Sequence, residues 1–171
     1  MKTVTLKDAK KMLSNKQIDT ALFDKGYTIL MPKARAKKWL KALRSGEYIQ
    51  AEGTLHDPDI GGFCCLGVEQ YCNNDGFVEN SYRDETSDYG SWDSFPSVSY
   101  LRTAGMLYVN SHNSDSSDPY ISAADTNVSD LNDSMVTKHR KVNQHKTIRT
   151  TVPENDFAKI ADYLDKAMLV Y

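Results

Sequence analysis

The chain lacks the features that place a protein in a membrane or direct it out of the cell. No apolar run among its 171 residues approaches the roughly 20 residues of a membrane-spanning helix. The lysines of the opening segment, MKTVTLKDAKKMLSN, are not followed by the apolar stretch of a signal peptide. Three unevenly spaced cysteines are a poor disulfide framework. We therefore expect a cytoplasmic protein with reduced thiols and no membrane partner.

The sequence also lacks the short motifs of common catalytic sites, namely a Gly-rich phosphate loop, HExxH and a nucleophile elbow. Two HxS/T motifs begin at His112 and His145. Paired motifs of this kind occur in two-histidine phosphodiesterases, where each histidine handles a proton at phosphorus. Here they lie in polar segments, 33 residues apart, rather than on core strands. We favour a non-enzymatic protein without a cofactor and keep a cyclic nucleotide phosphodiesterase as an alternative.

All three cysteines fall within nine residues, in the stretch GFCCLGVEQYC. Adjacent cysteines rarely bridge each other, because the small ring strains the peptide between them. A zinc site would combine Cys64, Cys65 or Cys72 with His56 at spacings unlike those of structural zinc sites. A helix over about 65–73 places Cys65 and Cys72 on one face. We predict that the cysteines pack between a strand and a helix, and a functional thiol or a metal site are the alternatives.

Charge is strongly segregated along the chain, although the formal net charge is −2. Residues 1–46 contain 12 Lys or Arg and 3 acids, residues 47–135 contain 2 and 16, and residues 136–171 contain 7 and 4. The opposite charges would neutralise each other within one fold or across a homodimer. The alternative is a basic face for a phosphate-bearing ligand.

Periodic apolar residues mark two helices clearly. One follows Pro32, and the other begins near Thr151 and Glu154, which resemble a capping box. The apolar stripes consist of Ala36, Trp39, Leu40 and Leu43, and of Phe157, Ile160, Ala161, Leu164 and Met168.

Shorter elements occupy the rest of the chain. We expect helices over about 6–14, 65–73 and from Pro96 to near Gly105, with the first capped by Thr5 and Asp8. Strand composition occurs in GYTILMP, EYIQAEGTL and MLYV. Helices and strands alternate without a strict βαβ rhythm, which indicates the α+β class. We predict a compact single domain over residues 1–171, with amphipathic helices packed on a small, mostly antiparallel sheet.

Residues 136–151, termed the basic arm, contain five Lys or Arg, two His and no acid. The arm is either a β-hairpin or a mobile loop, and its cations either contact phosphates or form a solvated surface. Duplex nucleic acid is not favoured, because the acidic middle of the chain would repel a long polyanion. A small anionic ligand is compatible with both charge regions. The cations are Lys138, Arg140, Lys141, Lys146 and Arg149.

Four segments follow in a distinctive order, KKWLKALRSGEYIQAEGTL, GFCCLGVEQYC, DLND and FAKIADYLDKAM. Together they resemble a family of small tailed-phage proteins of uncharacterised function, with the pattern W-x-x-ALRSG-x-Y-x-Q, CCLGV, LND and F-x-x-IA-D. The resemblance covers most of residues 37–168. The matching positions are Trp39, Arg44, Ser45, Gly46, Tyr48, Gln50, Cys65, Gly67, Asn132 and Asp133.

Five of the matching positions are polar and have no obvious structural need. Either a convergent ligand site or a polar structural network would explain them. They are Arg44, Tyr48, Gln50, Asn132 and Asp133. The chain departs from the family pattern in an N-terminal extension, about 1–32, and in the basic arm. Both additions are basic, which indicates an acquired ligand or partner.

The resemblance implies a phage accessory protein in the host cell cytoplasm. Our leading hypothesis is counter-defence by sequestering a small anionic nucleotide signal, of the cyclic nucleotide or ADP-ribose type. Its ligand would contact the five polar positions and the cations of the basic arm. The main alternative is an inhibitor that binds a host defence protein through the acidic segment 79–120. The anchors of that surface would be Tyr82, Tyr89 and Trp92.

Overall fold

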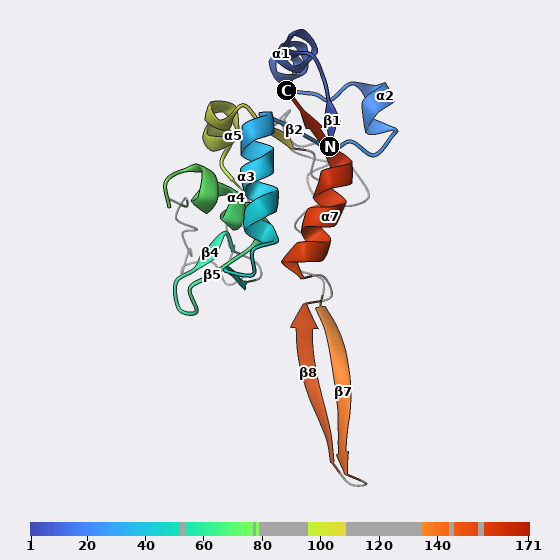
Figure 1. Cartoon of the computed structure of the whole chain (residues 1–171), viewed down its shortest axis with the longest axis vertical. Helices are drawn as coiled ribbons and strands as arrows, with labels where there is room; N and C mark the ends of the chain where they lie inside the picture. The colour runs from blue at the N-terminus through green and yellow to red at the C-terminus, as the bar shows by residue number, and fades with distance from the viewer. Residues whose placement is uncertain (52–53, 77, 79–95, 109–134, 144–145, 154–155) are drawn as a thin grey trace, which may run out of the picture.

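The computed structural model describes residues 1–51, 54–76, 78, 96–108, 135–143, 146–153 and 156–171. In this part of the chain, helices are combined with small sheets, which confirms the predicted α+β class (Figure 1). None of the helices described is both long enough and apolar enough to cross a membrane.

A four-stranded sheet lies at the centre of the body, in the order β1-β9-β2-β6. Its strands are β1 (Lys2–Thr3), β2 (Ile29–Met31), β6 (Leu107–Tyr108) and β9 (Met168–Val170). We expected mostly antiparallel pairing, but β9 is parallel to both β1 and β2, and β2 with β6 is the antiparallel pair. Strands this short carry no local signal for direction. The direction of β9 is set by the preceding helix, which returns the chain to the sheet beside β2.

Three helices enclose the main core on one face of this sheet. They are α3 (Lys33–Leu43), α4 (Cys65–Asn73) and α7 (Phe157–Ala167), and α3 packs against both of the others. Every residue of the two predicted apolar stripes is buried. Trp39 is fully buried, and its indole N–H donates a hydrogen bond to the carbonyl of Cys65 at 2.8 Å. The shorter helix α5 (Val98–Ala104) ends at Gly105, as expected.

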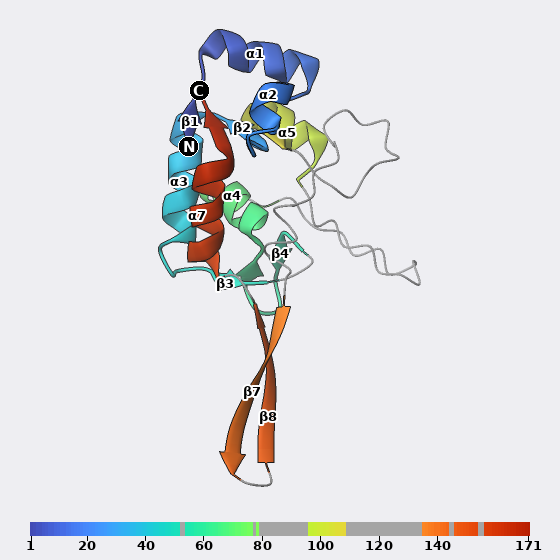
Figure 2. The same cartoon turned by 90° about the vertical axis from the view of Figure 1, so that its right-hand side faces the viewer.

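The N-terminal extension covers the opposite face of the sheet. It contains α1 (Leu6–Asn15) and α2 (Thr20–Phe23), which lie at the end of the body where the two termini meet (Figures 1 and 2). A second apolar cluster joins Ala9 and Met12 of α1 to Leu30, Leu107 and Leu169. The neighbouring residues of the same strands belong to the main core, as the alternation of a β-strand requires. The predicted cap of α1 is confirmed by a 3.1 Å hydrogen bond from the Asp8 N–H to the Thr5 hydroxyl.

The predicted start of the last helix is wrong. Asp156 caps α7, because its carboxylate accepts a hydrogen bond from the Lys159 N–H at 2.9 Å. Thr151 belongs instead to a strand, where it pairs with Thr137. Because Thr151 pairs within the hairpin, it is not available to cap the helix that follows.

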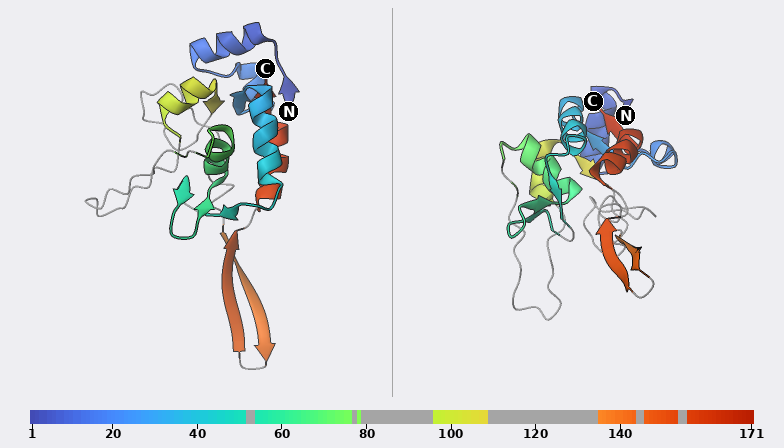
Figure 3. Two further views of the ribbon diagram at one scale, coloured as in Figure 1. Left: turned by 60° about the vertical axis from the view of Figure 1, so that its left-hand side comes forward. Right: turned by 60° about the horizontal axis from the view of Figure 1, so that its bottom comes forward.

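Two further sheets lie toward the other end of the molecule. The first contains β3 (Ile49–Gln50), β4 (His56–Asp57) and β5 (Gly62–Phe63), in the order β3-β5-β4. The second is a hairpin of β7 (Met135–Asn143) and β8 (Lys146–Pro153), so the hairpin interpretation of the basic arm is confirmed. The hairpin extends away from the helices, as Figures 1, 2 and 3 show from different sides.

Candidate functional site

The structure divides the expected ligand-binding residues into two groups. Arg44, Tyr48 and Gln50 lie where α3 ends and β3 begins, on the body. The five cations lie on the two strands of the basic arm. The other expected residues fall outside the described part of the chain, namely Asn132, Asp133, His112, His145, Tyr82, Tyr89 and Trp92. The phosphodiesterase and the acidic anchor surface therefore stay predictions.

Positive charge is distributed along the length of the basic arm. In the register of the hairpin, Lys138 lies opposite Thr150 and Lys141 lies opposite Thr147. His139 lies opposite Arg149, and Lys146 pairs with Asn143 beside the turn. No acid occurs anywhere in the arm to compensate these charges. The arm is therefore a continuous cationic segment rather than a set of internal ion pairs.

Arg44 has a structural partner on the body. Its guanidinium lies 2.8 Å from a carboxylate oxygen of Asp162 and 3.8 Å from one of Asp165, both on α7. The N-terminal ammonium group also reaches Asp165, at 2.8 Å. Arg44 thus joins the end of α3 to α7 through an exposed ion pair. This structural role is enough to explain the residue without a ligand.

Tyr48 belongs to an aromatic cluster beside the small sheet. Its ring meets Phe63 and Tyr71 edge-on, with centroid distances of 5.8 and 5.9 Å. His56 stacks on Phe63 at 4.5 Å. Burial raises the pKa of Tyr48. Tyr71 keeps 39% of its surface exposed, so this cluster presents an aromatic ring to solvent. Gln50 lies next to the cluster, since it pairs with Phe63 across β3 and β5.

Cys64 and Cys65 occupy the junction of β5 and α4, as expected, and Cys72 lies in the last turn of α4. Cys65 is fully buried, and Cys64 caps α4 by accepting a hydrogen bond from the Gly67 N–H at 3.3 Å. All three are free thiols. Within the described ranges, no three His, Cys, Asp or Glu side chains gather as metal ligands. The first two cysteines are therefore packing and capping residues.

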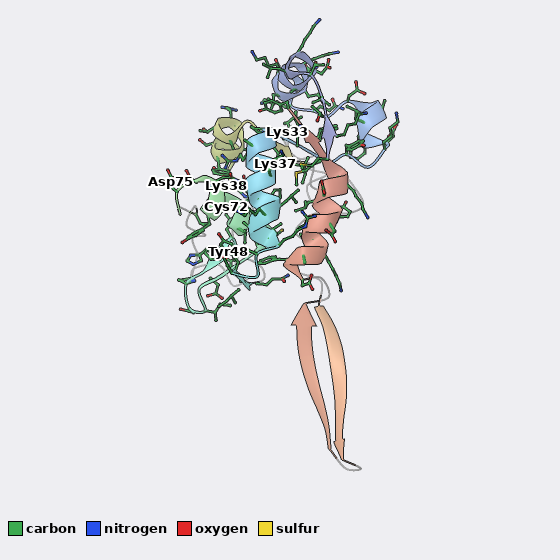
Figure 4. All side chains as sticks on the ribbon, viewed as in Figure 1. Lys33, Lys37, Lys38, Tyr48, Cys72 and Asp75 are labelled. Atoms are coloured by element: carbon green, nitrogen blue, oxygen red, sulfur yellow. The ribbon has the colours of Figure 1, made fainter. Side chains whose placement is uncertain are left out.

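Cys72 is half-buried and lies close to Glu69 and Lys38 (Figure 4). Burial raises the pKa of its thiol to about 11, and the Glu69 carboxylate adds to this rise. Lys38 and Arg35 lower the pKa but do not outweigh the other two effects. The thiol stays protonated at neutral pH, a state that does not serve a nucleophile.

This pKa predicts slow alkylation of Cys72 in the folded protein. Because the pKa is raised from 9.0 to about 11, the thiolate fraction near neutral pH falls by about 100-fold. We expect carboxamidomethylation by iodoacetamide to slow by up to that factor and to accelerate as the pH rises toward 11. Peptide mapping by mass spectrometry would follow each cysteine. The urea-unfolded chain is the control, and rapid labelling of folded Cys72 at neutral pH would contradict the prediction.

A buried charged cluster, which the sequence did not predict, joins α3, α4 and α5. Glu69 is completely buried, and Arg35 lies beside it with Nε 2.7 Å from Oε1. The Tyr100 hydroxyl donates to Oε2 at 2.7 Å, and the Asn73 amide donates to Oε1 at 3.1 Å. Burial and the neighbouring carboxylate raise the pKa of Tyr100. Both oxygens of Glu69 are occupied, so the carboxylate fixes three helices together and is not free for acid–base chemistry.

Comparison with known proteins places the chain in a family. No curated protein and no solved structure matches it. A family match covers residues 31–168, from the end of β2 through α7 into β9. This match leaves out almost all of the N-terminal extension and includes the positions of the basic arm and the buried cluster. The chain therefore belongs to the family described as Domain of unknown function (DUF8296).

Proposed function

We propose that the protein is a non-enzymatic accessory protein of a tailed phage, which binds a phosphate-bearing nucleotide ligand through its basic arm in the host cytoplasm. The observation that carries the proposal is the charge of the arm. It holds five Lys or Arg and no acid, while the remainder of the chain holds 16 Lys or Arg and 23 Asp or Glu. A solvated surface in an acidic protein needs no such concentration of cations.

Binding of an anion would also stabilise the arm. A two-stranded hairpin is marginally stable on its own, and this one extends away from the helices of the body (Figure 2). Its cations repel one another, because no acid in the arm separates them. Phosphate groups would remove this repulsion and would form charge-assisted hydrogen bonds with Lys and Arg. Binding would therefore stabilise the hairpin as well as hold the ligand.

Sequestration is the role that suits such a protein during infection. A protein that withholds a nucleotide immune signal, of the cyclic nucleotide or ADP-ribose type, needs tight binding and no turnover. The saturated carboxylate of Glu69 and the protonated thiol of Cys72 support a binding role over a catalytic one. The exposed ring of Tyr71, beside Tyr48, offers a surface on which a base would stack.

Ligand release tests the proposal directly. The purified protein is incubated with a mixture of nucleotide messengers, filtered and heat-denatured, and the released material is identified by mass spectrometry. We expect intact nucleotide from the wild type, and at least about 10-fold less from the double variant Arg140→Ala/Arg149→Ala. The control is Lys37→Ala/Lys41→Ala, which removes the same charge from exposed positions of α3.

The other results of this experiment are equally specific. Cleaved nucleotide would contradict the non-enzymatic role and favour the phosphodiesterase alternative. If no nucleotide is released on heating and the protein retains a stoichiometric host protein from lysate, the inhibitor alternative is favoured. Equal losses in the arm variant and the α3 variant would show that net charge, rather than the arm, holds the ligand.

A further inference from the structure

The length of the basic arm and the spacing of its cations indicate what kind of ligand it binds. Its strands contain 9 and 8 residues, which correspond to a length of roughly 25–30 Å. From Lys138 to Asn143, whose register partner is Lys146, the chain advances five residues, or about 17 Å. The cations are therefore spread along the length of the arm and over both faces of the ribbon. A small nucleotide concentrates its phosphates at one point, so it would meet a fraction of them.

We infer that the arm binds duplex DNA, with its two-stranded ribbon lying in the major groove. This inference goes beyond the proposed function and shares with it only the premise that the arm binds phosphate groups. The major groove of B-form DNA is about 12 Å wide and admits a two-stranded β-ribbon. The duplex carries one negative charge per about 1.7 Å of its axis, so phosphates along the groove would meet cations spread along the arm. RNA duplexes fit less well, because their major groove is deep and narrow.

A duplex had been disfavoured because the acidic middle of the chain, residues 47–135, would repel a long polyanion. The described acids of this segment, such as Asp57 of β4, lie on the body rather than on the arm. Charges separated by more than about 8–10 Å are largely screened at physiological salt. The arm extends away from the body in Figures 1, 2 and 3, and a strand of 8 residues such as β8 is roughly 25 Å long. For these described acids, repulsion of a duplex at the outer half of the arm is weak.

Salt dependence of DNA binding provides the test. Fluorescence anisotropy of a labelled duplex of about 20 base pairs is measured with the full chain between about 50 and 200 mM NaCl. The logarithm of the association constant should fall linearly with the logarithm of salt concentration, with a slope of about −0.9 for each phosphate neutralised. Removing two cations, in Lys138→Gln/Arg140→Gln, should reduce the magnitude of this slope by about 1.8 and weaken binding at least about 10-fold.

Matched controls separate the arm from general electrostatics. Lys37→Gln/Lys41→Gln makes the same charge change on α3 and should leave the slope unchanged. Circular dichroism and thermal melting would verify that every variant is folded. A second arm variant, Lys146→Gln/Arg149→Gln, should reproduce the smaller slope from the opposite strand. If one arm variant fails to fold, the other still tests the inference.

Four results would overturn the inference. They are no binding to the duplex at low salt, equal weakening by the α3 variant, tighter binding to single-stranded DNA, and equal binding to an RNA duplex. The proposed function can fail separately. Intact small nucleotide released on heating, with no duplex binding, would overturn the duplex and keep the nucleotide-binding arm. An empty release experiment with no binding to any nucleic acid would reject both.

Discussion

Replacing Gly67 by alanine is expected to lower the free energy of unfolding by about 3 kcal/mol, near the upper end for overpacking substitutions. A Cβ atom at this position would lie 1.7 Å from the carbonyl oxygen of Leu55 and 2.7 Å from its carbonyl carbon. Both are backbone atoms of a buried residue, so no flexible side chain can move aside. Either α4 or the segment before β4 would have to shift, and the core around Leu55 and Leu66 would open.

The sign of this effect distinguishes it from helix propensity. Gly67 is inside α4, where alanine would otherwise be favoured over glycine by about 1 kcal/mol. The control is Gly46→Ala, which has open space around it but a φ of +73°. That variant should lose about 1 kcal/mol through backbone strain alone. Urea denaturation followed by circular dichroism would compare the two. A Gly67→Ala variant as stable as the wild type would show that α4 does not approach Leu55 so closely.

Helices were the part of the fold that local sequence predicted best. Their apolar stripes, as in α3, repeat with a period that few other structures share, and burial followed the stripe residue by residue. The direction of strand pairing was harder to predict from the sequence, because strands of two or three residues, such as β2, β6 and β9, do not encode direction. Thr151 is a second example. Its local pattern predicted a helix cap, but Thr151 instead pairs with Thr137 in the hairpin.

In the candidate site, too, local features were predicted from the sequence and long-range contacts were not. Charge composition is a local property, so it identified the basic arm, although the sequence left a hairpin and a mobile loop as alternatives. The buried cluster joins residues that are far apart, since Glu69 is 34 positions from Arg35 and 31 from Tyr100. One signal was available, namely a single acid within the largely apolar stretch CLGVEQYC. An acid in a stripe of buried residues needs a partner, but its identity depends on the folded arrangement.

The second large effect is expected from Arg35→Met, which should lower the free energy of unfolding by about 3–5 kcal/mol. Methionine has an apolar side chain that still packs on α3, but it lacks the cation that lies 2.7 Å from Glu69. The carboxylate, with 1% of its side chain exposed, would stay buried with Tyr100 and Asn73 as neutral donors. Because a buried anion without a cation is much more costly than a buried neutral group, the loss should appear in urea denaturation at neutral pH.

Arg44→Met is the matched control, since it removes an arginine at the end of the same helix from an ion pair of similar length, 2.8 Å. That pair is exposed, with 40% and 69% of the two side chains accessible, so its loss should cost below about 1 kcal/mol. The double variant Arg35→Met/Glu69→Met removes both buried charges and should recover at least about 1.5 kcal/mol relative to the sum of the single variants. Additive losses would mean that Arg35 and Glu69 act independently. A coupling of this size, together with a small loss for Arg44→Met, would show that burial, rather than the contact distance, determines how strongly an ion pair holds these helices together.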